Sequence, residues 1–274
     1  FKIKKNTTLN ISLTHNTHEN YTIFQNNFFY FEKNCEIKID DEFKLSNNTI
    51  NNINYSIQVG EGSDIKHNIF QNISNSSKLY LTSNTICEKK SSLKQNSYNF
   101  SDGFVRNFHY ASLNGEFSKA FLHGCFFLKD KNICSNKTCI THNAENCESN
   151  QTYKGILNNS SKASYYSNTF VSENAQKTEG YQLSKGILLT DNCSFFSKPE
   201  LRIFADDVKC SHGSTIGPVD QSALYYLRSR GINKNQAMQM IISAFIDEDL
   251  RYLDIKNFEK ISSNLSNYLN CLVE

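Results

Sequence analysis

The sequence predicts a mainly β fold followed by a small helical segment at the C-terminal end. Up to about residue 212, segments such as ENYTIFQNNFFYFEKNCEIKID and SKAFLHGCFFLKD mix β-branched with aromatic residues, alternate apolar with polar positions and show no helical stripe. The chain has only two prolines and eleven glycines in 274 residues, so Asn must take many of the left-handed positions that turns need. After Pro218 the apolar residues take up the period of helices.

The pattern of the β region leaves two architectures open. Apolar blocks recur at a rough spacing without a strict repeat, near residues 121, 138, 152, 163, 181, 187 and 201. This spacing is compatible with the stacked coils of a β-solenoid. It is also compatible with a β-sandwich, in which two antiparallel sheets pack face to face.

Three helices are expected between residues 219 and 270. Asp220 can cap the first helix, and Gly231 is the residue type usually found just past a helix end. Asn233 can cap the second helix, with Gln236 three residues later. The apolar face of this second helix would be formed by Ala237, Met240, Ile241, Ala244 and Phe245.

A break between the second and third helices is expected at residues 247–249. These residues are all acidic, and negative charge opposes the dipole at a helix C-terminus but favours the start of the next helix. We expect the apolar stripes to be packing faces, with partner binding as the alternative. The stripe of the third helix consists of Ile255, Phe258, Ile261, Leu265 and Leu269.

Charge and hydropathy exclude several classes of protein. A net charge of +2 without a basic cluster argues against nucleic-acid binding, because phosphate neutralisation needs a concentrated positive surface. No window approaches 18 consecutive apolar residues, and the chain shows no signal peptide, so we expect no membrane span. Because the chain opens at Phe1 and not at Met, we expect upstream sequence in the natural protein.

The cysteines and carboxylates show no standard catalytic or zinc motif. Nine cysteines is an odd number, and none form a C-x-x-C pair, which favours a reducing compartment over a disulfide framework. The sequence contains no phosphate-binding loop, nucleophile elbow or H-E-x-x-H motif. In the pairs Asp40-Asp41 and Asp206-Asp207, adjacent strand residues point to opposite faces, so neither pair can readily act as a joint acid and base.

Three of the seven histidines lie close to cysteines in the sequence, and the other four (His15, His18, His67 and His109) have no informative neighbours. The three are His123 with Cys125, His142 between Cys139 and Cys147, and His212 with Cys210. Residues two apart on a strand share a face and lie about 7 Å apart. Two ligands do not complete a tetrahedral site, so a metal there would need donors from elsewhere in the chain or from another subunit. A buried free cysteine beside a solvated histidine is the alternative.

A longer segment around Cys210 and His212 resembles a known family. Residues 198–232 read KPELRIFADDVKCSHGSTIGPVDQSALYYLRSRGI, and the likeness continues in HNAENC at 142–147, QTYKGIL at 151–157, AQKT at 175–178 and QMIISAF at 239–245. Together these segments resemble the SufB/SufD family of iron-sulfur cluster assembly proteins. The likeness covers roughly half of the chain.

The resemblance implies a right-handed parallel β-helix over residues 1–212 and a helical segment over residues 213–274. It also implies a non-enzymatic scaffold subunit of the SufBCD complex, whose β-helix pairs with SufB and whose helices dock the ATPase SufC. An iron-sulfur cluster would then be held transiently in the complex, with no cofactor bound tightly by this chain alone. Family members work in bacterial cytoplasm and in plastids, and the Asn-rich composition fits the stroma of a protist plastid of the apicoplast type as well as a bacterium.

The resemblance also suggests roles for particular residues. Cys210 and His212 are expected at the SufB interface, with His212 as a metal ligand or proton acceptor during cluster assembly. Part of the SufC docking surface is expected on the first helix, because aromatic and arginine side chains anchor interfaces. That surface comprises Tyr225, Tyr226, Leu227, Arg228 and Arg230; the alternative is that the tyrosines pack on the end of the β-helix.

A second functional class is kept as an alternative. A secreted β-solenoid that binds or cleaves carbohydrate would also fit the strand pattern. The sequence has several N-x-S/T triplets, such as that at Asn72, but a chain this rich in Asn, Ser and Thr produces such triplets by chance. The two hypotheses differ in cysteine chemistry. The assembly scaffold is expected to keep its cysteines reduced, and the secreted protein is expected to form disulfides.

Overall fold

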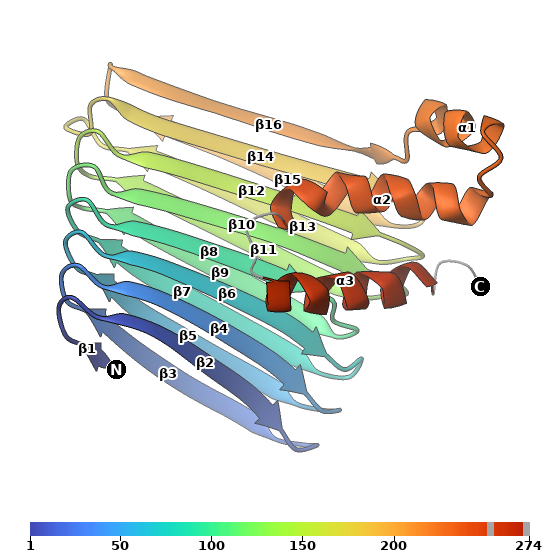
Figure 1. The fold of residues 1–274 in the computed structure, drawn as a ribbon, viewed down its shortest axis with the longest axis horizontal. Coiled ribbons are helices and arrows are strands. Elements are labelled where there is room, and N and C mark those ends of the chain that lie inside the picture. Colours follow the sequence, from blue (N-terminus) through green and yellow to red (C-terminus); the bar gives the residue numbers. More distant parts are fainter. Residues whose placement is uncertain (251–254, 271–274) are drawn as a thin grey trace.

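In the computed structural model, the chain winds into a parallel β-solenoid of about eight turns, with three helices after the last strand (Figure 1). The structure describes residues 1–250 and 255–270. Each coil contributes one strand to each of two eight-stranded sheets, whose inner faces enclose the core. All strand pairs within the sheets are parallel, so the β-solenoid interpretation is confirmed and the β-sandwich of antiparallel sheets is wrong.

The strands alternate between the two sheets along the chain. The odd-numbered sheet contains β1 (Lys2–Ile3), β3 (Thr22–Phe31), β5 (Ile50–Val59), β7 (Lys78–Cys87), β9 (Phe104–Leu113), β11 (Ile133–His142), β13 (Lys162–Val171) and β15 (Ser194–Ile203). The even-numbered sheet contains β2 (Thr8–Thr17), β4 (Glu36–Leu45), β6 (Asp64–Ile73), β8 (Ser92–Asn99), β10 (Lys119–Leu128), β12 (Glu148–Leu157), β14 (Thr178–Leu188) and β16 (Val208–Pro218).

Asparagine makes the tight turns of the solenoid, as the shortage of glycine predicts. Among the described residues, ten non-glycine residues have positive φ, and six of them are Asn. The turns stack in register from coil to coil: the side-chain amide of Asn34 donates to Oδ1 of Asn6, 28 residues earlier. Asn tolerates the left-handed region because its short polar side chain can bond locally.

The last strand is longer than expected. β16 runs to Pro218 and remains paired with β14 up to Leu188, so the solenoid extends beyond the boundary expected at residue 212. The proline is accommodated because β16 lies at the edge of its sheet, where a missing N–H breaks no ladder. The helical segment therefore begins at Gln221, after the Asp220 cap, and not at residue 213.

The three helices are α1 (Gln221–Ser229), α2 (Lys234–Leu250) and α3 (Ile255–Asn270). Both predicted caps are confirmed: Asp220 accepts from the backbone of Ser222 and Ala223, and Asn233 accepts from the backbone of Gln236. α2 and α3 lie on the outer face of the even-numbered sheet (Figure 1). Tyr268 donates to the carbonyl of Leu128 at 2.9 Å on that sheet.

The face that α2 buries differs from the predicted one. Ala237 is buried as expected, and Ile241 and Phe245 are half-buried against the same cluster. Met240 is exposed, however, and the buried residues also include Ile242 and Ile246, which were not predicted. Ala244 is exposed as well. This helix has apolar residues on more than one side, and the position of the sheet determines which side is buried.

The predicted break at residues 247–249 is wrong, because α2 continues through these acidic residues to Leu250. In α3 the predicted positions Ile261 and Leu265 are buried against the sheet. The side chains of Ile255, Phe258 and Leu269 lie outside the described residues. None of the described helices is both long and apolar enough to span a membrane.

Candidate functional site

Cys210 and His212 lie on β16, the edge strand at the C-terminal end of the solenoid. The register pairs Cys210 with Gly180 and His212 with Gln182, which are both buried inside the solenoid. Cys210 and His212 therefore face inward as well. His212 is nevertheless exposed, because no further coil of the described chain covers the inner face at this end.

Cys210 is half-buried and packs among small apolar residues. Together with Val208 it contacts a buried group formed by Val171, Ala175 and Ala205. Burial raises the pKa of its thiol above the ordinary value, although a hydrogen bond from the Gly180 backbone acts in the opposite direction. Cys210 is therefore held as a neutral thiol and is not an activated nucleophile by itself.

Apolar side chains accompany these two residues at the open end. Ile203 is 37% exposed and Phe204 is 61% exposed, at the end of β15, the edge strand of the other sheet. Phe204 lies against Phe170 with ring centroids 5.3 Å apart. The open end thus combines two unpaired strand edges, exposed apolar residues and the Cys210-His212 pair.

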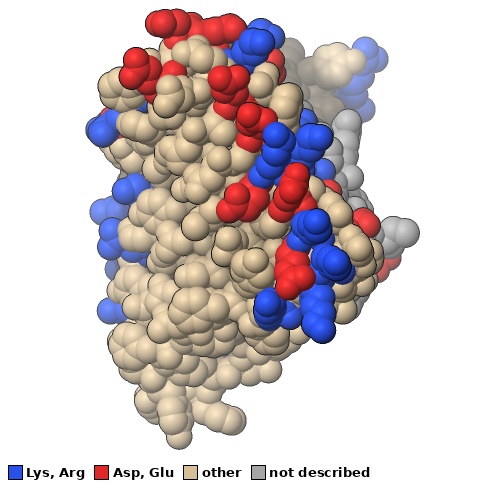
Figure 2. Space-filling view, turned by 90° about the vertical axis from the view of Figure 1, so that its left-hand side faces the viewer, with Lys and Arg blue, Asp and Glu red and all other residues tan. Residues whose placement is uncertain are grey.

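The face on which successive turns stack carries ion pairs between neighbouring coils. Lys89 lies 2.7 Å from Glu116, and Lys209 lies 2.9 Å from Glu179. Figure 2 shows this face, where acidic side chains concentrate towards the C-terminal end at the top and basic ones lie further down. Exposed pairs of this kind add little stability.

α1 extends beyond the last strand (Figure 1), and both of its tyrosine side chains are exposed. Tyr225 is 77% exposed and Tyr226 is 57% exposed, so neither ring is buried against the end of the solenoid. The guanidinium of Arg230 lies 5.3 Å from the centroid of Tyr226. Arg228 is exposed and Leu227 is half-buried.

The other two histidine-cysteine groups lie elsewhere in the solenoid. His123 and Cys125 share the outer face of β10, as their spacing predicts; Cys125 is buried beneath the helices, and His123 lies beside Phe121. His142 is buried inside the solenoid, where its Nε2 lies 2.8 Å from Ser149 Oγ and burial lowers its pKa to about 4. Across residues 1–250 and 255–270, no three His, Cys, Asp or Glu residues are placed to hold a metal ion.

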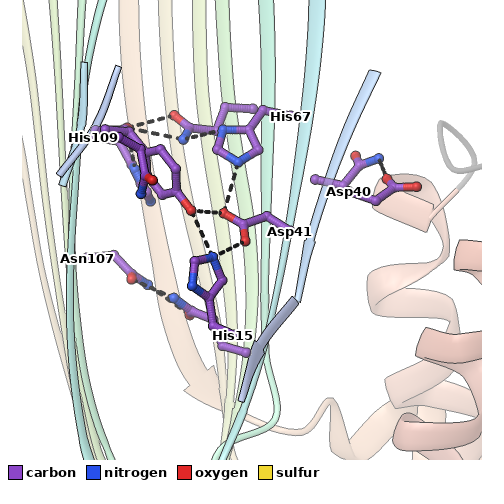
Figure 3. Close-up of polar contacts among 12 residues, drawn as sticks. His15, Asp40, Asp41, His67, Asn107 and His109 are labelled. Carbon is purple, nitrogen blue, oxygen red and sulfur yellow. Dashed lines mark hydrogen bonds and ion pairs between the residues drawn. The ribbon is translucent and has the colours of Figure 1, made fainter. Parts of the chain in front are cut away.

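A polar cluster that sequence reasoning missed lies inside the N-terminal coils (Figure 3). The Asp41 carboxylate is fully buried and accepts a 2.6 Å hydrogen bond from Tyr55. His15 Nε2 lies 3.0 Å from one carboxylate oxygen, and His67 Nε2 lies 3.3 Å from the other. Asp40 points outward and accepts from Asn68, so the expectation that the two aspartates face opposite ways is correct.

The electrostatics of this cluster favour an ionised Asp41. Burial by itself would raise the pKa of Asp41, but hydrogen bonds and positive charge from His15 and His67 outweigh it and hold the pKa below the ordinary value. The same carboxylate, together with burial, raises the pKa of Tyr55, which therefore remains a hydrogen-bond donor. The cluster ties β2, β4 and β6 to β5 across the interior.

A comparison with protein families decides what kind of solenoid this is. The family model described as "SUF system FeS cluster assembly, SufBD core domain" matches residues 13–245. The chain belongs to the SufB/SufD family. The match covers both the open end with Cys210 and His212 and the interior cluster around Asp41, and it confirms the resemblance of residues 198–232.

The chain is similar to proteins from bacteria and to a chloroplastic protein of a plant. The chain is 36% identical over 136 residues to the iron-sulfur cluster assembly protein SufD of Escherichia coli, covering 50% of this chain and 32% of that protein. It is 29% identical over 209 residues to a SufBD family protein of Synechocystis, and the match covers 76% of this chain and 46% of that protein. It is 40% identical over 101 residues to the chloroplastic protein ABCI7 of Arabidopsis thaliana, and that match covers 36% of this chain and 21% of ABCI7. The chain thus matches less than half of the length of each of these relatives.

Proposed function

We propose that this SufB/SufD family chain is a scaffold subunit for iron-sulfur cluster assembly that pairs with SufB through the open C-terminal end of its solenoid. The observation that carries the proposal is the uncovered inner face of the last coil. β15 and β16 present unpaired strand edges, which are the usual sites of strand addition by another chain. Exposed Ile203 and Phe204 beside them supply apolar area that a partner would bury.

The Cys210-His212 pair supports a role in handling the cluster, which is the cargo of the complex and not a resident cofactor. Imidazole and thiolate are competent iron ligands, and both side chains lie on the inner face at the proposed interface. Two donors are too few for a closed site, so the remaining ligands would come from SufB. An imidazole beside the thiol can also serve as the proton acceptor that metal binding by a protonated cysteine such as Cys210 requires.

The first prediction concerns His212. In His212→Ala, complexes with SufB and SufC should keep their size, but the rate of cluster formation in anaerobic reconstitution should fall at least about tenfold. The reason is that one exposed imidazole contributes little to a large interface but supplies a ligand or a proton acceptor. Complex mass by light scattering and cluster absorbance measure the two quantities separately.

His18→Ala is the matched control, because His18 is also exposed but lies in the turn before β3. Normal cluster formation in His212→Ala, at unchanged complex size, would contradict the assignment of His212. Cys210→Ser separates the thiol from the imidazole, and we expect a smaller loss because Cys210 also serves as packing.

We further propose that α1 forms part of the surface that docks the ATPase SufC. Tyr225 and Tyr226 are exposed, and Arg228 and Arg230 lie beside them on a helix that extends from the solenoid. Tyrosine and arginine are the residue types most enriched in binding hot spots. In this role the nucleotide chemistry belongs to the partner, in keeping with the lack of a phosphate-binding loop in this chain.

The second prediction follows from the exposure of these rings. Changing Tyr225 and Tyr226 together to Ala should weaken SufC binding at least about tenfold and leave SufB pairing intact, because neither ring is part of the solenoid core. Titration of labelled SufC measures the loss. Tyr21→Ala, which removes a ring that is 60% exposed in a turn, is the control, and unchanged SufC affinity in the double variant would contradict the proposal.

We place the complex in a reducing compartment, either bacterial cytoplasm or plastid stroma, since relatives include bacterial proteins and a chloroplastic one. The secreted carbohydrate-binding solenoid has no supporting observation beyond the strand pattern. A count of reactive thiols in the purified native protein tests this placement, because the scaffold function expects every cysteine to be reduced.

A further inference from the structure

The outer face of the odd-numbered sheet is an open surface of aromatic and basic side chains. The helices lie on the even-numbered sheet, and no other described element covers the odd-numbered one (Figure 1). Outward positions of neighbouring strands are in register here, so Phe108, Lys137, Tyr166 and Lys198 follow one another across β9, β11, β13 and β15. Exposed aromatic side chains gathered on one surface are a common feature of binding sites.

This surface is strongly unbalanced in charge. The five strands β7, β9, β11, β13 and β15 contain a single carboxylate, Glu200. Glu200 is already neutralised by Arg202, whose Nε lies 2.7 Å away, and by a hydrogen bond from the Tyr166 hydroxyl. The same five strands carry six cations: Lys78, Arg106, Lys137, Lys162, Lys198 and Arg202. The net charge of the whole chain is only +2, so the positive charge is concentrated on this sheet.

The cations are held in place by the rings. The guanidinium of Arg106 lies 4.6 Å from the centroid of Phe108. The ammonium of Lys137 lies 5.8 Å from the centroid of Tyr110 and 5.3 Å from that of Tyr166, and Lys198 lies 5.7 Å from Tyr166. Cation–π contacts of this kind restrict long side chains before any partner binds, which lowers the entropy lost on binding.

We propose that this surface binds an acidic patch on another protein. We define it as the cation-aromatic face, comprising Arg106, Phe108, Tyr110, Lys137, Tyr166 and Lys198. Carboxylates of the partner would approach the preordered cations from solvent, and the surrounding rings would bury apolar area at the centre of the contact. The surface is separate from the inner face of the last coil and from α1, so it offers a site for a third partner alongside the two proposed above.

The arrangement favours an acidic protein over a single-stranded nucleic acid. A nucleic acid would use the aromatic rings as stacking platforms for its bases. In this structure Arg106, Lys137 and Lys198 already lie over the rings of Phe108, Tyr110 and Tyr166, so stacking bases would have to displace them. Carboxylates need no such displacement.

A photo-crosslinking experiment tests the proposal on the full chain in its native cells. A benzoylphenylalanine residue placed at Phe108 reports what lies against the face, and mass spectrometry maps the crosslinked peptide. We expect one main protein adduct whose crosslinked peptide is net negative. In Lys137→Glu with Lys198→Glu the adduct should fall at least about tenfold, since the charge that attracts the partner is reversed.

The matched control is Lys33→Glu with Lys131→Glu, which reverses two exposed lysines in turns and should leave the adduct unchanged. The mapped acidic segment, made as a labelled peptide, and a 20-nucleotide oligothymidine are then titrated against the purified chain by fluorescence anisotropy. Tighter binding of the peptide than of the oligonucleotide supports the proposal. No adduct, a nuclease-sensitive adduct, an adduct to a second copy of this chain, a neutral or basic crosslinked peptide, or an equal loss in the control would overturn it.

Discussion

Replacing Asp41 with Ala should destabilise the N-terminal coils by about 3–5 kcal/mol, the range for breaking a buried ionic contact by removing one partner. The carboxylate is the common acceptor of Tyr55, His15 and His67 in the interior. Without it, buried Tyr55 and His67 and half-buried His15 lose their shared partner at once, and the small residue leaves a cavity among them.

Urea unfolding followed by circular dichroism measures the size of this effect, and hydrogen exchange locates it. Exchange should become fastest in β2, β4 and β6, whose side chains meet at Asp41. Asp64→Ala removes a carboxylate that is exposed at the start of β6 and should change stability by less than about 0.5 kcal/mol. If both variants unfold at the same urea concentration, the cluster does not stabilise the fold.

The stabilisation of the folded chain by Asp41 should also depend on pH and should decrease as the pH falls. The pKa of Asp41 in the folded chain lies below its ordinary value of 3.8. A carboxyl group of this kind stabilises the folded state at pH values above its unfolded pKa, and the stabilisation is lost as the pH falls through the lower, folded pKa. The difference in unfolding free energy between the natural chain and Asp41→Ala should therefore be largest near neutral pH and shrink below about pH 3.8.

Gly155→Val should destabilise the central coils by about 3 kcal/mol, at the upper end of the usual cost of overpacking. Gly155 on β12 is in register with Phe126 on β10, and a Cβ atom at Gly155 would lie 2.3 Å from the Phe126 ring. Gly124 and Tyr153 repeat the arrangement on the same two strands, so the glycines here provide space for aromatic rings of the adjacent coil. The interior cannot expand locally, because coils stack directly above and below.

Thermal unfolding compares Gly155→Val with Gly217→Val, its matched control. A Cβ atom at Gly217 would meet nothing within 4 Å, so this second variant should leave the melting temperature nearly unchanged. Adding Phe126→Leu to Gly155→Val shortens the ring that the new side chain strikes and should recover part of the loss. A melting temperature for Gly155→Val equal to that of the control would contradict the packing argument.

Much of the fold was predictable because it depends on local chemistry. The polar turn residue Asn and the absence of a helical stripe indicate strands, and the helix caps at Asp220 and Asn233 depend on a few adjacent residues. The side of α2 that packs was not predictable, because Met240 and Ile242 are both apolar and only the position of the sheet distinguishes them.

The interior cluster escaped prediction because its members belong to different coils. A period of two tells which residues of one strand share a face, but it does not tell which strands become neighbours. His67 and Asp41 are 26 residues apart, so their contact could be predicted only from the coil length of 28 residues. The turn residues Asn6, Asn34 and Gly62 recur at this spacing of 28 residues. Aligning the sequence on these turns would have placed Asp41 and His67 on neighbouring strands.

The returning helices change how the solenoid holds together. In a simple stack each coil contacts only its neighbours, so an end can open without affecting distant coils. Here Asn257 on α3 donates to Asp40 at a separation of 217 residues, and Tyr268 donates to Leu128 at a separation of 140. Opening the first coils therefore also loosens the last segment of the chain. These two contacts should make the array more cooperative than a simple stack, and they can form only after the coils that receive α3 have folded.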